Sequence, residues 1–155
     1  MYEGDQLKYG WISGGKAAIP VAMGASEIRT APGAGFGNMD ATGYFEYHDD
    51  GDTEEVFGSV ESPYGTGSAS EGADVHNCIY DHSAAFKVPV LAGDGTYAIA
   101  MIGDTCDTGM TGNVIGADLT ASSEEHLIIL AGDLVNNNWV IVRLNPFVQG
   151  ETNVV

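Results

Sequence analysis

Two short apolar runs of the kind expected of β-strands lie in the last third of the chain, on either side of a polar turn. Residues 139–144 read Trp-Val-Ile-Val-Arg-Leu, and residues 126–130 read His-Leu-Ile-Ile-Leu. Three asparagines at residues 136–138 lie between the two runs, and asparagine tolerates the left-handed backbone of tight turns. The pattern predicts a β-hairpin over residues 126–144.

Two further hairpins are predicted upstream by the same reasoning. Apolar runs at residues 84–91 and 97–102 flank a turn that contains two glycines. Residues 44–47 and 55–60 are rich in aromatic and β-branched side chains and flank an acidic turn. We expect the four strands of the last two hairpins along the chain to form the core.

Helical patterns are scarce, because 22 glycines and 5 prolines interrupt any apolar repeat of 3.6 residues. Short strands without βαβ alternation predict a single-domain, all-β fold, either a β-sandwich or a barrel, with a jelly-roll arrangement among the options. This β-domain is expected over residues 41–155. Residues 1–40 are rich in Gly and Pro and are predicted to form an extended N-terminal arm that a neighbour orders.

The charge balance narrows the classes of partner. The 155 residues include 22 acidic and only 5 basic side chains, which gives a formal net charge of −17. Binding of nucleic acid requires Lys and Arg against phosphate, so we expect no nucleic-acid partner. Anionic membrane surfaces are disfavoured by the same repulsion.

The cysteines and the N-terminal residues give little information about the cellular compartment of the chain. Cys78 and Cys106 are too few for a disulfide framework, and both a bridge between them and free thiols stay open. The first residues contain no basic segment followed by an apolar run, so no cleavable secretion signal is expected. No apolar run approaches the length of a membrane span.

One triplet matches a catalytic motif. Asp107-Thr108-Gly109 has the sequence found in aspartic proteases, where two such carboxylates share a proton and activate water. A single copy would require a homodimer, and an ordinary Asp-Gly turn is the alternative. We find no P-loop, nucleophile elbow or dinucleotide fingerprint, and we expect the chain not to be an enzyme.

Metal-ligand residue types occur in two places. Asp50, Asp52, Glu54 and Glu61 have the spacing of positions 1, 3, 5 and 12 of a calcium-binding loop, but the glycine required at position 6 is absent. A simpler acidic loop for Ca²⁺ or Mg²⁺ is one interpretation, and a solvated hairpin tip without a cofactor is the other. The second set, a possible zinc site, comprises His76, Cys78, Asp81 and His82.

Aromatic residues offer an alternative function. Tyr64 and Trp11, with the Gly- and Ser-rich loop at residues 65–72, could form a stacking platform for carbohydrate or a host receptor. Packing in the core or at an interface is the other interpretation of these rings.

The Gly- and Pro-rich leading segment, the strong acidity, the short β-strands and the absence of a catalytic motif together resemble the cement or decoration proteins of tailed viruses such as bacteriophages. The resemblance is to this general class of protein. It covers the whole chain and includes no diagnostic motif. It implies a structural protein on the outer surface of the virion, because a chain of this charge avoids the packaged genome.

The same resemblance implies the major capsid protein as partner, and self-association into a homodimer or homotrimer over joints between capsomers. Contacts are expected from the predicted arm through Tyr9, Trp11, Ile19 and Phe36, which could add strands to neighbouring sheet edges.

Overall fold

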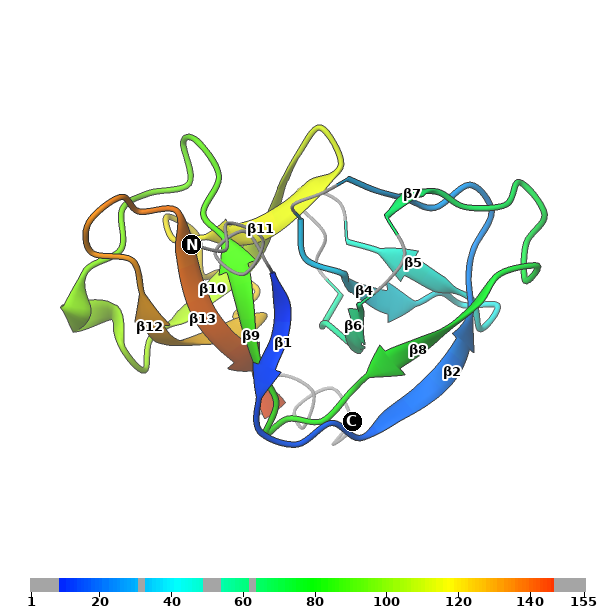
Figure 1. The fold of residues 1–155 in the computed structure, drawn as a ribbon, viewed down its shortest axis with the longest axis horizontal. Helices are drawn as coiled ribbons and strands as arrows, with labels where there is room; N and C mark the ends of the chain where they lie inside the picture. Colours follow the sequence, from blue (N-terminus) through cyan, green and yellow to red (C-terminus); the bar gives the residue numbers. More distant parts are fainter. Residues whose placement is uncertain (1–8, 31–32, 49–53, 62–63, 147–155) are drawn as a thin grey trace, which may run out of the picture.

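The structure, a computed structural model, describes residues 9–30, 33–48, 54–61 and 64–146. It confirms the predicted all-β class. Two large antiparallel sheets pack in a sandwich-like arrangement and lie side by side in Figure 1, with β1 running between them. Within the described residues, no helix is long and apolar enough to span a membrane.

The first sheet has six strands and contains most of the C-terminal half of the chain. Its strands, in spatial order, are β1 (Gly10–Ser13), β9 (Ala85–Pro89), β13 (Trp139–Leu144), β12 (Leu127–Gly132), β10 (Thr105–Thr111) and β11 (Val114–Asp118). A bridge between Val90 and Ala117 joins the segment after β9 to β11, so the sheet curls until its far strand returns to β9.

The second sheet has five strands and is built from the N-terminal half. Its strands, in spatial order, are β2 (Ala18–Ala22), β8 (Val75–Ile79), β6 (Gly58–Val60), β4 (Phe36–Met39) and β5 (Phe45–Tyr47). A bridge between Met23 and Phe45 brings its two ends together in the same way. A small separate sheet pairs β3 (Ile28–Arg29) with β7 (Gly65–Thr66), and the 3-10 helix η1 covers Ile99–Met101.

One hydrophobic core connects the two large sheets. Alternate residues of β13 are buried, and Val140, Val142 and Leu144 point into this core. Phe36 from the second sheet meets Phe86 from the first edge to face, with ring centroids 5.4 Å apart. Each such buried large side chain contributes about 1.5–3 kcal/mol to the stability of the fold.

Residues 10–30 and 33–39 differ from the expected extended arm, because they supply β1 to β4 and pair with strands from the rest of the chain. The glycines that suggested an arm allow close packing instead. A Cβ atom at Gly35 would lie 1.9 Å from the carbonyl oxygen of Val60, and one at Gly37 would lie 2.1 Å from that of Glu46. The start of the predicted arm, residues 1–8, lies outside the described residues.

The predicted hairpin at residues 126–144 is confirmed as β12 paired with β13. The other two differ from prediction. Residues 97–102 form a loop with η1 rather than a partner strand for β9. The strands β5 and β6 exist, but β4 lies between them and pairs with both.

Candidate functional site

The Asp107-Thr108-Gly109 triplet lies within β10, and its carboxylate has a structural role. The Asp107 side chain accepts hydrogen bonds from the backbone N–H groups of Glu124 (3.0 Å) and Glu125 (2.9 Å) and from the Ser123 hydroxyl (3.2 Å). These bonds fix the segment that leads into β12. The carboxylate is buried.

Thr108 belongs to a buried polar cluster that joins the two sheets. Its hydroxyl oxygen lies 2.9 Å from Nδ1 of His48, after β5, and 3.3 Å from Nδ1 of His126, before β12. The backbone N–H of Thr108 donates to the same His126 nitrogen at 3.1 Å, so the proton of neutral His126 sits on Nε2. The two rings meet edge to face with centroids 4.9 Å apart.

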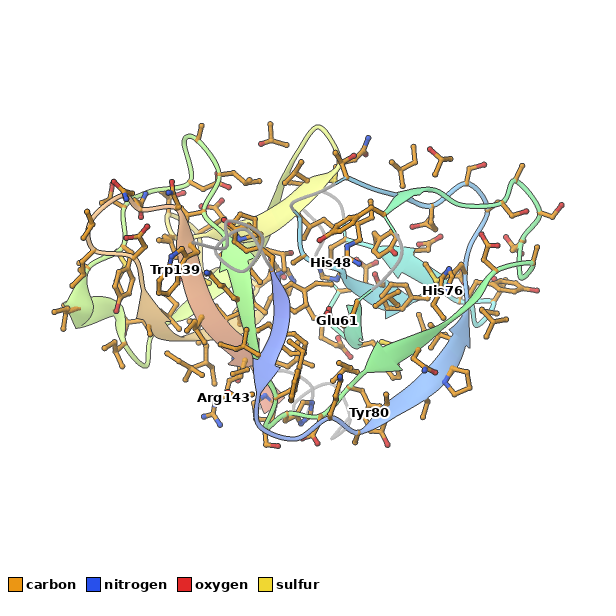
Figure 2. All side chains as sticks on the ribbon, in the orientation of Figure 1. His48, Glu61, His76, Tyr80, Trp139 and Arg143 are labelled. Atoms are coloured by element: carbon orange, nitrogen blue, oxygen red, sulfur yellow. The ribbon has the colours of Figure 1, made fainter. Side chains whose placement is uncertain are left out.

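His48 is held neutral by this environment. Burial lowers its pKa to about 3, and the neighbouring His126 ring acts in the same direction. Figure 2 shows His48 near the junction of the two groups of strands. His48 is therefore an uncharged, hydrogen-bonded side chain in the interior.

Tyr9 and Trp11, two predicted contact residues, pack against the chain itself. The Tyr9 hydroxyl lies 3.4 Å from the backbone oxygen of Asn138. The indole N–H of Trp11 donates to the Gly15 oxygen at 3.0 Å, and the Lys16 ammonium lies 4.5 Å from the centre of the Trp11 ring. Both side chains remain partly accessible.

The other two predicted contact residues have opposite environments. Ile19 lies on the edge strand β2 and is 40% exposed. Phe36 is completely buried between the sheets, contrary to the expected contact role, because it lies on the inner face of β4 against Phe86.

The predicted calcium ligands are only partly described. Asp50 and Asp52 lie outside the described residues. Glu61 accepts hydrogen bonds from the Ser59 hydroxyl at 2.6 Å and from the backbone N–H of Trp11, and so holds β1 beside the second sheet. No group of three or more His, Cys, Asp or Glu in the described part of the chain is arranged to hold a metal ion.

The residues of the predicted zinc set do not act together. Cys78 is buried, and burial raises the pKa of its thiol to about 12. Asp81 accepts hydrogen bonds from the Ser83 backbone and hydroxyl in a surface turn. His76 and His82 line different cavities. Cys106 is also buried, and the two cysteines are free thiols in this structure.

Tyr64 and the glycine-rich loop after it do border a cavity, of about 410 Å³. Its polar lining includes Glu27, Asp74 and His76. The back of the Tyr64 ring is supported by the fully buried Arg29, whose guanidinium carbon lies 4.3 Å from the ring centre. Trp11, the other proposed platform residue, is not part of this lining.

A larger cavity of about 490 Å³ combines aromatic rings with carboxylates. Phe57, just before β6, and Tyr80, just after β8, stack with ring centroids 6.2 Å apart and planes 24° apart. Tyr80 keeps 39% of its surface exposed, and Figure 2 shows it beyond the end of β8. The remaining lining residues are Asn38, Met39, Glu54, Glu55 and His82.

This cavity adjoins a second one of about 260 Å³, because Asn38 and Glu54 line both. The second cavity adds the carboxylates of Glu27 and Glu46. Glu27 is fixed in place, since it accepts the Tyr47 backbone N–H at 2.7 Å. We call the two cavities together the acidic groove.

Four large aliphatic side chains project from two loops of the first sheet. Ile99 is 63% exposed, Ile102 53%, Leu134 58% and Val135 87%. Asn137 connects the loops, because its side chain accepts the Tyr97 backbone N–H and donates to the Gly95 oxygen, both at 2.8 Å. We call these four residues the apolar tip.

Sequence reasoning did not identify the acidic groove or the apolar tip. The groove collects residues that lie as far apart in sequence as Ser26 and Asn113, and only the folded chain brings them together. The exposure of Ile99 and Ile102 was hidden by an apolar run that resembled a buried strand. Searches with the chain matched no protein-family model, no curated protein and no solved structure.

Proposed function

We propose that the chain is a structural virion protein that binds the outer surface of an assembled capsid and stabilises the joints between capsomers. The apolar tip carries this proposal. Exposed aliphatic side chains gathered on neighbouring loops are typical of protein-contact surfaces, because burying them against a partner removes apolar area from water. Here they project from a chain whose formal charge of −17 otherwise favours solvation.

The net negative charge of the chain favours a position on the outer face of the shell. Carboxylates are repelled by packaged nucleic acid, so the outer face is favoured. The partners in this proposal are the major capsid protein and further copies of the chain. Many weak contacts to an assembled lattice add by avidity, and binding only the assembled form stabilises it by mass action.

Immunogold labelling tests the virion role directly. Antibodies raised against the purified chain should label intact heads of the virus that encodes it. Unlabelled heads, together with the chain confined to the soluble fraction of the infected cell, would refute the role.

A matched pair of variants tests the apolar tip. Val135→Ser should reduce co-sedimentation of the chain with purified heads, because it removes an apolar contact. Val75→Ser removes the same group from β8, where Val75 is 58% exposed, and should leave co-sedimentation unchanged. Equal effects of the two substitutions would count against the tip as the contact surface.

Carbohydrate binding is the second candidate, and the cavity beside Tyr64 favours it. An aromatic ring next to polar side chains is the usual composition of a sugar site. Binding on a glycan array that Tyr64→Ala abolishes would support this function. Absence of binding by the natural sequence would remove it.

A further inference from the structure

The acidic groove has a chemistry distinct from that of the apolar tip. Glu27, Glu46, Glu54 and Glu55 contribute four carboxylates to its lining, and no Lys or Arg is among the described lining residues. A concave surface with one sign of charge concentrates counter-charged ligands, because its walls limit screening by water. The groove therefore favours a cation.

The two stacked aromatic rings of the groove favour a guanidinium over an ammonium as the bound cation. Phe57 and Tyr80 border the larger cavity, and a planar guanidinium stacks on such rings, whereas an ammonium is compact and strongly hydrated. A guanidinium carries five N–H donors and no acceptor, which complements carboxylates that only accept. A sugar hydroxyl both donates and accepts, and the lining side chains of the larger cavity that can donate to it are those of Asn38, Tyr80 and His82.

A second copy of this chain offers few cations for the groove. Only 5 of its residues are basic. Of the four described ones, Lys16, Arg29 and Lys87 already lie over aromatic rings of the same molecule, at 4.5, 4.3 and 4.9 Å from the ring centres, and Arg143 on β13 is half-buried. These contacts also show how this fold accommodates cations, by pairing them with exposed or half-buried rings.

We propose that the acidic groove binds an arginine side chain of a different protein, with the guanidinium stacked on Tyr80 and donating to Glu54 and Glu55. The inference goes beyond the virion role, because it concerns the chemistry of the bound group and not the identity of the partner. A basic surface loop is the kind of partner that fits. The contact would also lower the repulsion among the four carboxylates.

Three short peptides test the proposal in NMR titrations of the full chain at low ionic strength. Ac-Gly-Arg-Gly-NH₂ should shift the amide signals of residues 38–39, 54–57 and 80–82. The lysine peptide should bind several-fold more weakly, because it does not stack as a plane. The citrulline peptide keeps the shape of arginine without its charge and should not bind detectably.

Two substitutions that each remove one negative charge locate the site. Glu54→Gln should weaken binding of the arginine peptide roughly fivefold. Glu71→Gln is the control, since Glu71 is exposed and lines neither cavity of the groove, and it should leave the affinity unchanged. Tyr80→Leu should remove the preference for arginine over lysine while the thermal unfolding temperature confirms a folded chain.

Signal shifts spread over the acidic surface, with equal affinities for arginine and lysine and equal effects of Glu54→Gln and Glu71→Gln, would overturn the proposal and indicate nonspecific charge attraction only. Unchanged spectra on addition of the arginine peptide would overturn it as well. Neither result depends on whether antibodies label virus heads, so failure here is distinguishable from failure of the virion role.

Discussion

The burial of the His48 ring makes the stability of the fold depend on pH. Its pKa is near 6.5 in the unfolded chain and about 3 in the folded one, so the unfolded state binds the proton more readily. The contribution of the neutral ring to stability is complete above pH 6.5. It is lost progressively as pH falls from 6.5 towards 3.

The first prediction is that acidification from pH 6.5 to 4.5 destabilises the natural chain more than His48→Gln. The difference should approach about 1.4 kcal/mol per pH unit, since glutamine keeps a polar group near Thr108 but does not titrate. Urea unfolding at several pH values measures it. Identical slopes for His48→Gln and the natural chain would contradict the assignment.

Glycine at position 35 is required by the distance between two strands. The second prediction is that Gly35→Ala destabilises the fold by about 1–3 kcal/mol, because its methyl group would meet the Val60 backbone oxygen and force β4 away from β6. Gly24→Ala is the control, since the nearest atom to its new methyl group would be 3.4 Å away. Thermal unfolding measures both, and equal losses would show that the contact with the Val60 oxygen is not the cause.

At the scale of elements, the turn between β12 and β13 combines local and distant interactions. Asn137 has a φ of 55°, the left-handed conformation that its residue type tolerates. The carboxylate of Asp133 accepts the backbone N–H groups of Val135, Asn136 and Asn138. The Asn137 side chain then fastens the loop at residues 95–97 to this turn.

The third prediction concerns the two hydrogen bonds that the Asn137 side chain makes with this loop. Asn137→Gly keeps the left-handed backbone but removes two hydrogen bonds to the neighbouring loop, so it should cost about 1–3 kcal/mol. Hydrogen exchange of the Tyr97 amide should accelerate. Asn136→Gly controls for the flexibility of glycine in the turn, and a Tyr97 amide that exchanges equally slowly in both variants would refute the role of Asn137.

Local patterns predicted the hairpin at residues 126–144 but also predicted a partner strand at residues 97–102, which form a loop with η1. The hairpin of β12 and β13 was predicted because two apolar runs and the turn residues between them lie within one short segment. The pairing of β5 and β6 was predicted wrongly, because β4, from residues that resembled an arm, lies between them. A short run of apolar and β-branched residues indicates that a strand forms, but the pairing depends on contacts with distant residues.

The same limit applies to the candidate site. Asn38, Glu54, Phe57 and Tyr80 carry no shared spacing that would identify them as one site, and they meet only because β4, β6 and β8 are arranged in one curled sheet. Phe36 shows the reverse case. An aromatic residue in a Gly-rich segment was expected at the surface, yet it lies on the inner face of a strand.

At the scale of the whole molecule, self-repulsion is the main consequence of composition. With 22 acidic and 5 basic side chains, the compact state brings like charges closer together than the unfolded chain does. Part of that repulsion acts within the acidic groove. Added salt shortens its range, because the Debye length falls from about 30 Å at 0.01 M to about 10 Å at 0.1 M.

The fourth prediction is that the thermal unfolding temperature at pH 7 rises by several degrees between 10 mM and 300 mM NaCl. Near the isoelectric point of about 4.1 the net charge is small, and the same addition of salt should have little effect. Differential scanning fluorimetry measures both series. A rise of equal size at the two pH values would mean that screening of net charge is not the cause.

The course of residues 10–22 has a consequence for any shortened form of the chain. β1 closes one side of β9, and a few residues later β2 closes one side of β8 in the other sheet. A fragment that has lost the chain up to Ala22 would therefore expose the unpaired backbone donors and acceptors of both β9 and β8. These two strand edges lie on opposite halves of the molecule. Each edge is a template for strand pairing between molecules, so such a fragment would be bivalent and would polymerise.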